Sequence, residues 1–534
     1  MASSDAPKSL WRTVISRDPT RGGAERPRLA LTVVTAVLFV TFLDTTIVSV
    51  TLGNIQSDVH AGVVSLQWVV NAYTLVFASL MLTAGSLGDR WGRKRVMIAG
   101  LVIFCAGSVL SALAGSVAVL IAGRAVMGLG AAASEPGTLS LIRHIYPDRR
   151  ARAKALGAWA AVSGLALAAG PVVGGLLVGA FGWRSVFWFN LIVGVVVLVA
   201  ALRYVPESAD PQPGPVDVPG FVLGATFLAC VIYAGISGEQ VGYSAASVIA
   251  LFVVGGIAGV GFLVVETRAR NPMFDFAYLR SPLVRSALIV AFAVYFGIFS
   301  IFFFTALYLQ EVVSYSGWRI AAVFAPMAVA IILGSLISGF WVASRGSRTP
   351  MIVGCVLGGA GILLTRQFLG VTVHFTPLAL SLMLAGIGFG IAVVPLTSAV
   401  LSGVPAEHSG MAAAATNTMR QVGAVVGVAA LGSLVNSFLN SDLTSRLNQL
   451  QIPANFQAIV IDAIETGNVP AGGDQAASAA YGPIVDKVIT ATYAAFHRGL
   501  DVALLVSAVM ILLAAVLTAI SLPRFDRAGY EYDT

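Results

Sequence analysis

The feature that most constrains this chain is a series of mostly apolar runs, each long enough to cross a lipid bilayer as a helix. A helix rises about 1.5 Å per residue, so roughly 20 apolar residues span the ~30 Å hydrocarbon core of a membrane. With 57% hydrophobic and 11% charged residues, the chain is predicted to be an all-α polytopic membrane protein with fourteen spans. These spans lie near 29–52, 66–88, 96–114, 117–141, 155–179, 184–202, 218–237, 245–265, 286–310, 319–343, 350–370, 376–402, 410–436 and 499–522.

The placement of the basic residues predicts the topology. Of the 32 Lys and Arg residues, 24 lie in the two terminal tails and in alternate connections between spans. Cytoplasmic connections carry such an excess of positive charge, so both termini are predicted to be cytoplasmic and the chain to lie in a bacterial inner (cytoplasmic) membrane. The formal net charge of +7 therefore reflects topology, and we expect no nucleic-acid partner.

The sequence contains an internal repeat. The segment GSLGDRWGRKRVMIAG at 85–100 aligns with GFWVASRGSRTPMIVG at 339–354, and GLG at 128–130 aligns with GIG at 386–388. The offsets of 254 and 258 residues predict two six-helix bundles that rock about a central site, with two helices inserted between them. The predicted organisation is a cytoplasmic tail at 1–28, a six-helix bundle at 29–203, two linker helices at 204–270, a second bundle at 271–522 with an external loop at 437–498, and a cytoplasmic tail at 523–534.

Two charged residues lie at similar depth inside the predicted spans. Asp44 interrupts the run LTVVTAVLFVTFLDTTIVSVTL, where an ionised carboxylate costs roughly 2.5 to 3.5 kcal/mol. Arg124 lies about eight residues from the outer end of the fourth span, as Asp44 does in the first, so the two can interact. A carboxylate whose proton affinity responds to burial and to a nearby arginine is suited to carry a proton, which makes Asp44 and Arg124 candidate proton-coupling residues. The alternatives are that Asp44 only bonds helix partners through Thr41 or Thr45, and that Arg124 extends to the outer interface.

Glu135 is the other acidic residue deep in the first half. It follows Arg124 by eleven residues, a rotation of about 1,100° at 3.6 residues per turn, so both side chains point to nearly the same side of the helix. We expect Glu135 to meet a cationic substrate or a second proton in the cavity, and the alternative is a packing partner for a hydroxyl or amide group. The thirteenth span contributes further candidate cavity residues, namely Asn417, Arg420 and Gln421.

The connection between the second and third spans combines glycines with charges. Its glycines permit a tight turn and close backbone approach, and its acidic residue faces a cluster of basic ones. The pattern resembles the signature between the second and third helices of the major facilitator superfamily. The resemblance implies that Asp89 and Arg93 form a charge lock that holds the outward-open state, although the second copy has Ala343 in place of the acid. The candidate switch residues are Gly85, Gly88, Asp89, Arg90, Gly92 and Arg93.

The fifth span carries a glycine-rich string, GLALAAGPVVGG at 164–175. Its small residues at helical spacing predict one smooth face for close helix contact, and its proline predicts a kink. The string is similar to the antiporter motif of exporters in the same superfamily, with Ala166 where a glycine is usual. The motif residues are Gly170, Pro171, Gly174 and Gly175.

The whole chain resembles the fourteen-helix drug and proton antiporter group of that superfamily. The segments FLDTTIVSVTL, RAVMGLGAA, WRSVFWFNLIVG and NTMRQVGAVVGVA carry the resemblance. It implies a non-enzymatic, monomeric, proton-coupled efflux antiporter for lipophilic cationic or neutral drugs and dyes, driven by the proton-motive force without a cofactor. The thirteenth span and the predicted span 319–343 carry no carboxylate, which disfavours export of divalent cations.

Two other functions remain open on the sequence. The chain could export a dedicated product such as a self-made antibiotic, siderophore or lipid. It could also be an integral membrane enzyme that modifies lipids, but that chemistry needs a metal or acidic cluster such as DDxxD or HExxH, and neither string occurs. The phosphate-binding pattern GxxxxGK[ST] is also missing from the sequence, which disfavours a pump driven by ATP.

Overall fold

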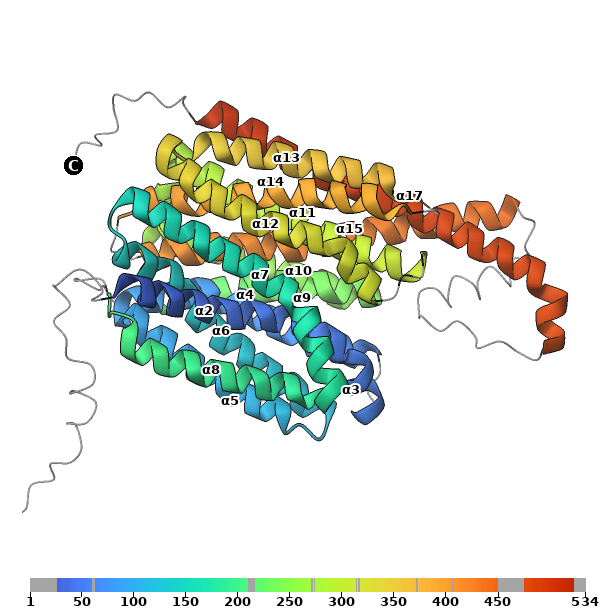
Figure 1. The fold of residues 1–534 in the computed structure, drawn as a ribbon, viewed down its shortest axis with the longest axis horizontal. Helices are drawn as coiled ribbons and strands as arrows, with labels where there is room; N and C mark the ends of the chain where they lie inside the picture. Colours follow the sequence, from blue (N-terminus) through green and yellow to red (C-terminus); the bar gives the residue numbers. More distant parts are fainter. Residues whose placement is uncertain are drawn as a thin grey trace, which may run out of the picture.

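The computed structural model describes residues 26–522 apart from 60–62, 210–216, 270–271, 273, 314, 316, 371–372, 406–407 and 450–474. Fourteen helices of at least 20 residues make up most of this part of the chain and run roughly side by side (Figure 1). Twelve of the helices in the described part are long and apolar enough to cross a membrane on their own. The long helices are α2 (Pro27–Ile47), α4 (Val63–Trp91), α5 (Arg93–Ala112), α6 (Val117–Ile145), α7 (Arg149–Phe181), α8 (Arg184–Tyr204), α9 (Val218–Val241), α10 (Ala246–Arg268), α11 (Pro282–Glu311), α12 (Gly317–Arg345), α13 (Arg348–Phe368), α14 (Phe375–Ser402), α15 (Ser409–Gln449) and α17 (Gln475–Ser521).

Short polar connections end one helix and begin the next. The side chain of Asp148 accepts a hydrogen bond from the Ala151 N–H at 2.7 Å and so caps the first turn of α7. Gly182 ends the same helix with φ of 77°, a conformation that a residue with a Cβ rarely adopts. The sequence therefore sets the helix boundaries locally, while the apolar runs between them set the helix lengths.

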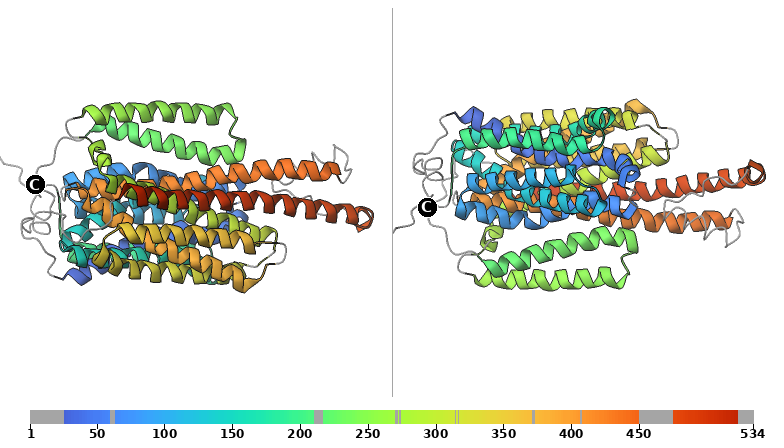
Figure 2. Two further views of the ribbon diagram at one scale, coloured as in Figure 1. Left: turned by 90° about the horizontal axis from the view of Figure 1, so that it is seen from above. Right: turned by 90° about the horizontal axis from the view of Figure 1, so that it is seen from below.

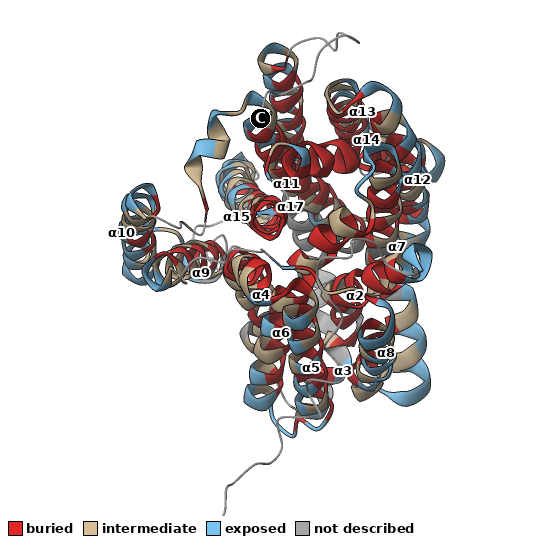
Figure 3. Cartoon of the chain, turned by 90° about the vertical axis from the view of Figure 1, so that its left-hand side faces the viewer, coloured by how far each residue is buried: buried red, intermediate tan, exposed pale blue. Residues whose placement is uncertain are grey.

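The helices form two halves, which we name by their members. The first half comprises α2 and α4 to α8, and the second half comprises α11 to α15 and α17. The inserted helices α9 and α10 pack against each other at the side of the bundle, where α9 contacts α4 and α15 (Figures 2 and 3). The fold is thus the predicted one of two six-helix bundles with two additional helices.

The internal repeat is visible in the packing of equivalent glycines. A Cβ atom at Gly128 would lie 2.5 Å from the carbonyl oxygen of Tyr73, and one at Gly386 would lie 2.5 Å from that of Met327. Tyr73 and Met327 are separated by the same 254 residues as the two copies of the predicted loop repeat. Only glycine permits this close helix contact, so each half places a glycine at the equivalent position.

The α4–α5 turn differs from the prediction in one respect. Helix α4 continues to Trp91, so Gly85 and Gly88 lie inside a helix and not in a loop. The turn itself is made by Gly92 with φ of 107°, and its repeat partner Gly346 has φ of 75°. Gly85 instead serves close approach, because a Cβ there would lie 2.6 Å from the carbonyl oxygen of Gly410.

Two pairs of helices make the most extensive contacts between the halves. Helix α4 packs on α15 through Gly85, and α7 packs on α12 through Gly157. A Cβ at Gly157 would lie 3.2 Å from the Cα of Gly339, the repeat partner of Gly85. Both contacts lie near the end of the bundle that holds the α4–α5 turn, which we call the α4–α5 end. The halves are therefore tightly joined at that end.

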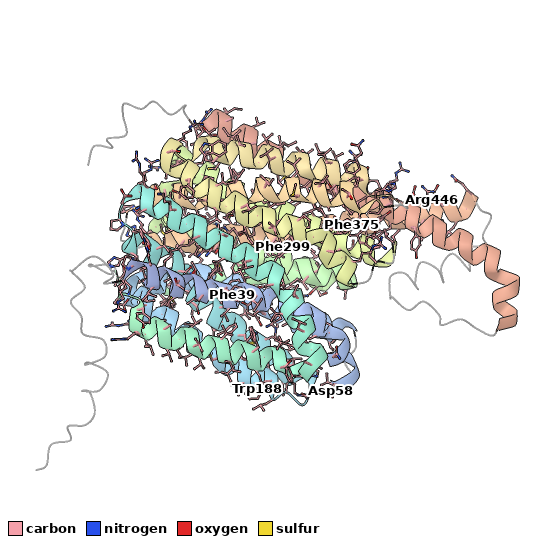
Figure 4. All side chains as sticks on the ribbon, viewed as in Figure 1. Phe39, Asp58, Trp188, Phe299, Phe375 and Arg446 are labelled. Atoms are coloured by element: carbon pink, nitrogen blue, oxygen red, sulfur yellow. The ribbon has the colours of Figure 1, made fainter. Side chains whose placement is uncertain are left out.

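The opposite end differs from the sequence prediction. The segment 437–498 was expected to be an external loop, but α15 continues to Gln449 and α17 begins at Gln475. Both helices extend beyond the rest of the bundle, as the position of Arg446 shows (Figure 4). Asp442 on α15 accepts hydrogen bonds from Arg446 one turn later in the same helix, at 2.6 Å, and from Arg498 on α17, at 3.1 Å. The bond to Arg498 ties α15 to α17 at this end. The central part of the expected loop, residues 450–474, lies outside the described residues.

Candidate transport site and conformational lock

Asp44 and Arg124 form an ion pair inside the first half. Arg124 Nη1 donates to Asp44 Oδ2, and both side chains are fully buried. Arg124 Nε also donates to the carbonyl oxygen of Val69 at 3.0 Å. On the other side of the carboxylate, Asn190 Nδ2 donates to Asp44 Oδ1 at 2.6 Å. Helices α2, α6 and α8 thus meet at one carboxylate, and the two residues whose equal depth predicted a contact lie together.

Tyr73 on α4 extends this buried polar group. The guanidinium carbon of Arg124 lies 4.5 Å from the centre of the Tyr73 ring, and the Tyr73 hydroxyl donates to the carbonyl oxygen of Thr41 at 2.9 Å. Asp44, Arg124 and Glu135 all lie close enough to the Tyr73 hydroxyl to exert an electrostatic effect on it. The ion pair and Glu135 therefore belong to one electrostatic neighbourhood around the Tyr73 ring.

A second buried polar cluster surrounds Arg420 on α15. Its Nη1 donates to Asn417 Oδ1 at 3.0 Å, and its Nη2 donates to Thr397 Oγ1 on α14. The guanidinium carbon lies 5.1 Å from the centre of the Trp159 ring on α7 and 5.3 Å from that of Tyr295 on α11. Arg420 is 1% exposed, so aromatic faces and hydrogen bonds take the place of water around its charge.

Glu135 lies next to this cluster. It is 1% exposed, and its Oε2 has no hydrogen-bond partner among the described residues. Arg420 is the cation whose charge acts on Glu135. Of the predicted cavity residues, Arg420 and Asn417 are bonded to each other, Glu135 lies within the electrostatic reach of Arg420, and Gln421 is half-buried.

A small, largely apolar pocket lies beside Arg420 between the two halves. Its walls come from α7, α11, α12 and α14, and Tyr295 separates it from the guanidinium of Arg420. Phe299, one turn further along α11, lies near the middle of the bundle (Figure 4). The pocket is lined by Ala160, Ser163, Gly164, Tyr295, Ile298, Phe302, Ala328, Ile331, Ser335 and Val393.

The α4–α5 turn contains the predicted charge lock. Asp89 Oδ1 accepts hydrogen bonds from Arg93 Nε and Nη2 at 2.8 and 2.7 Å. The same carboxylate accepts the N–H groups of Gly410 and Met411 in the first turn of α15, each at 2.8 Å. Unpaired N–H groups and the helix dipole make a helix N-terminus a favourable partner for a carboxylate. Asp89 therefore joins the first half to the second, and Arg93 holds Asp89 in position; we call these four residues the lock.

A segment after α8 braces the lock. Arg93 Nη1 donates to Ser208 Oγ at 2.7 Å, and the Arg93 N–H donates to the Ser208 carbonyl at 2.8 Å. Glu207 accepts the N–H groups of Lys94 and Ser208 at 3.1 and 2.9 Å and lies 3.6 Å from Arg95. Burial raises the pKa of the Glu207 carboxyl. This effect is larger than the opposing effect of its hydrogen-bond and cationic partners, which lower the pKa.

The glycine-rich string of α7 serves two different neighbours. A Cβ at Gly170 would overlap Thr46 Oγ1 on α2, and one at Gly164 would lie 2.8 Å from Ile331 on α12. A Cβ at Gly175 would meet no atom within 4 Å. Of the residues expected on one smooth face, Gly157 and Gly164 both pack on α12 of the other half, whereas Gly170, which lies off that face, packs on α2 of its own half. Pro171 and Gly174 lie within the continuous backbone of α7.

Several residues of these sites were missed by sequence reasoning. Asn190 lies within the motif WRSVFWFNLIVG and received no predicted role of its own, although it is a lone amide in an apolar span. Trp159 and Tyr73 look like ordinary lipophilic residues, and only the fold shows that their rings cover the guanidinium groups of Arg420 and Arg124. The role of Glu207 and Ser208 depends on a contact with the α4–α5 turn more than 110 residues earlier in the chain.

The sequence of this chain is similar to a known family and to individual proteins of that family. Residues 34–428 match the family model described as Major Facilitator Superfamily. The drug efflux pump JefA of Mycobacterium tuberculosis is 33% identical over 93% of this chain and 99% of its own length. The multidrug efflux pump LfrA of Mycolicibacterium smegmatis is 32% identical over 95% of this chain and 98% of its own length.

Solved structures share the fold at low sequence identity. A human organic anion transporter superposes with a TM-score of 0.61 at 14% identity, covering 92% of this chain and 99% of its own. The proton:xylose symporter XylE superposes with a TM-score of 0.58 at 15% identity, covering 92% of this chain and 94% of its own. The shared arrangement of helices, the family match and the relatives together lead to one conclusion. The chain belongs to the major facilitator superfamily of membrane transporters.

Proposed function

We propose that the protein is a proton-coupled antiporter that exports lipophilic cationic or neutral molecules from a bacterial cell. The single observation that carries the proton coupling is Asp44, a fully buried carboxylate whose two oxygens face Arg124 and Asn190. Burial and the partners of a carboxylate decide how tightly it holds a proton. The relatives named as efflux pumps support export of drugs as the transported cargo.

We further propose that the α4–α5 end faces the cytoplasm of the cell and that the protein acts as a monomer in the inner membrane. In this orientation, both terminal tails are cytoplasmic, and the basic residues of the connections lie on the inner side. The lock then closes the cytoplasmic entrance, and its release opens the site toward the cytoplasm. Each half moves as a unit about the central pocket during this change.

The driving force is sufficient for such a cycle. One elementary charge that crosses the membrane inward gains about 2.3 kcal/mol per 100 mV of membrane potential. About 1.4 kcal/mol corresponds to a tenfold gradient, so one proton exchanged for one neutral molecule supports a gradient of well over tenfold at that potential. Exchange of one proton for one monovalent cation moves no net charge and is driven by the pH gradient alone. No phosphate-donating cofactor is required in this scheme.

Dye efflux from everted membrane vesicles tests the function. Vesicles that contain the protein should accumulate a fluorescent lipophilic dye when respiration energises them, and a protonophore should abolish the accumulation. Vesicles prepared without the protein are the control. Accumulation that persists with the protonophore but stops on ATP depletion would contradict proton coupling.

A second candidate is the export of one self-made product. The tetracenomycin C resistance and export protein of Streptomyces glaucescens is 31% identical over 86% of this chain, and its name describes a dedicated exporter. A panel of chemically unrelated dyes distinguishes the two functions. Transport of several unrelated dyes supports multidrug export, and transport of a single aromatic product with no dye supports the dedicated exporter.

A further inference from the structure

The Arg420 cluster is divided between the two halves of the molecule. Glu135 on α6 and Trp159 on α7 belong to the first half. Arg420 belongs to the second half, and so do the two residues that fix it, Asn417 on α15 and Thr397 on α14. The Trp159 ring is fixed independently, because its Nε1 donates to Thr138 Oγ1 on α6 at 3.1 Å. A relative movement of the halves would therefore carry Arg420 away from Glu135 and Trp159.

The groups of the first half that face Arg420 have the chemistry of a cation site. A carboxylate attracts a positive charge, and the face of an indole ring binds cations within about 6 Å of its centre. Glu135 Oε2 is buried and lacks a hydrogen-bond partner among the described residues, so it has capacity for another donor. In the present state, the guanidinium carbon of Arg420 lies 5.1 Å from the centre of this ring, and the charge of Arg420 acts on the carboxylate of Glu135.

The pocket beside the cluster has a volume of about 30 Å³ in this state, so it would receive the apolar part of a ligand only after the halves separate. Ala160, next to Trp159, forms one of its walls, and Val393, one turn from Thr397, forms another. The two serine hydroxyls in its walls are already bonded within the protein: Ser163 donates to the carbonyl of Ala160 and Ser335 to that of Gly390. The pocket therefore offers apolar contact, while the charge would be recognised at its inner end.

We propose that Arg420 is a tethered competitor that occupies the binding site of a lipophilic organic cation at Glu135 and Trp159. The inference rests on the proposed function and names the substrate class of that site. In the state described here, with the lock closed, Arg420 takes the place of the substrate cation. When the halves separate at the α4–α5 end, Arg420 withdraws with α15, and the organic cation binds to Glu135 and Trp159 with its apolar body in the pocket.

This competition gives export a direction. A tethered group acts at a high effective concentration, in the millimolar range or above, so it competes well with a dilute substrate. A ligand that binds only when Arg420 withdraws has lower affinity for the closed-lock state. The substrate cation therefore binds at the α4–α5 end and is expelled when that end closes, which places Arg420 back against Trp159.

Binding of tetraphenylphosphonium to the purified full-length protein in detergent tests the proposal. Arg420→Gln should bind this cation about tenfold more tightly than the natural protein, within the range of typical coupling between sites. Glu135→Gln and Trp159→Leu should bind it about tenfold more weakly. Arg319→Gln, which removes one exposed positive charge from the same half, is the matched control and should leave affinity unchanged.

Two further measurements keep the result interpretable. Arg420→Lys keeps the charge but lacks the planar fork that bonds Asn417 and Thr397, so it should bind the cation with an affinity between those of the natural protein and Arg420→Gln. A neutral dye of similar size should bind the natural protein and Arg420→Gln equally. If Arg420→Gln does not fold, Arg420→Lys provides the comparison. Unchanged or weaker cation binding by the folded variants would overturn the proposal.

The lock supplies an independent arm of the same experiment. Asp89→Asn weakens the closed state and should raise cation affinity in the natural protein, because Arg420 withdraws more often. The same change in an Arg420→Gln background should add little, since the competitor is already gone. Equal gains in both backgrounds would contradict the proposal. Proton-dependent dye efflux by the natural protein would leave the proposed function standing in that case.

Discussion

At the scale of single residues, the buried charges of this transporter are held by partners from several helices. The carboxylate of Asp44 is bonded on one side by a cation and on the other by the amide of Asn190. A buried charge that loses one partner is still shielded from water and keeps its desolvation penalty. Removal of one partner therefore costs more stability here than removal of one partner of a surface ion pair. The amide of Asn190 is therefore part of the buried Asp44 site as much as the charges are.

Asn190→Leu should destabilise the protein and impair coupling. The substitution keeps the volume but leaves Asp44 Oδ1 without its 2.6 Å donor. Hydrogen bonds to charged groups contribute about 1.5 to 3 kcal/mol, so the melting temperature in detergent should fall measurably. Asn190→Leu in an Asp44→Leu background is the control, and there it should have little effect. An equal fall in both backgrounds would show that Asn190 acts only through packing.

Glu207 gives a prediction about pH. Burial raises its pKa in the folded protein above that of the unfolded chain, so the folded state binds this proton more readily. Its contribution to stability is then most favourable below the unfolded pKa and falls as pH rises through the folded pKa. Glu207→Gln cannot titrate. The melting temperature of the natural protein, relative to this variant, should therefore decline from acidic to neutral pH, and a rise would contradict the sign.

At the scale of helices, glycines decide how closely the halves approach. Helix α4 contacts α15 at Gly85, where a Cβ would overlap that of Ala414 and lie 2.6 Å from the Gly410 carbonyl. Backbone on the opposing helix cannot move aside as a flexible side chain can. The same helix carries Gly88, where a Cβ would lie 3.9 Å from its nearest neighbour, in ordinary contact. The two positions form a natural pair of test and control.

Gly85→Ala should open the α4–α5 end, whereas Gly88→Ala should leave it closed. The added methyl at residue 85 separates α4 from α15 and weakens the bonds between Asp89 and the first turn of α15. Spin labels on the ends of these helices should report a longer distance in Gly85→Ala by double electron–electron resonance. An unchanged distance in Gly85→Ala, or an equal increase in both variants, would show that the contact does not hold the closed state.

Much of the fold, but less of the site, could be predicted from the sequence. Apolar run length is sufficient to locate the helices, and the offset of 254 residues identifies the two halves. Equal depth in two spans was enough to pair Asp44 with Arg124. Contacts that depend on helix rotation and neighbour identity could not be read in this way: the ring of Trp159 over Arg420 and the division of the α7 glycines between two partners are examples.

Helix ends were the other source of error. The composition of 437–498 is only mildly apolar, so it resembled a loop, yet α15 and α17 continue into it as helices outside the predicted spans. Helix formation does not require an apolar surface once a neighbouring helix and ion pairs support it, and the bonds of Arg446 and Arg498 to Asp442 supply that support. Hydropathy therefore located the spans but not the full helices.

At the scale of the whole molecule, two buried sites lie along the boundary between the halves, and a third lies inside the first half. The lock joins α4 to α15 at one end, Arg420 on the same α15 meets Trp159 further along the helix, and the Asp44 site lies within the first half. Arg420 is ten residues after Gly410, about 15 Å along a helix. One rigid helix thus connects the lock with the proposed substrate site, while Tyr73 lies within the electrostatic reach of both Asp44 and Glu135.

The central claim is that the proton carried by Asp44 drives export, and transport by reconstituted proteoliposomes tests it most directly. An imposed pH gradient should drive uphill movement of a lipophilic cationic dye by the natural protein. Asp44→Asn keeps the shape of the side chain without a titratable group, so it should lose this gradient-driven transport and still exchange dye for dye across the membrane. Uphill transport by Asp44→Asn at the natural rate would contradict the claim.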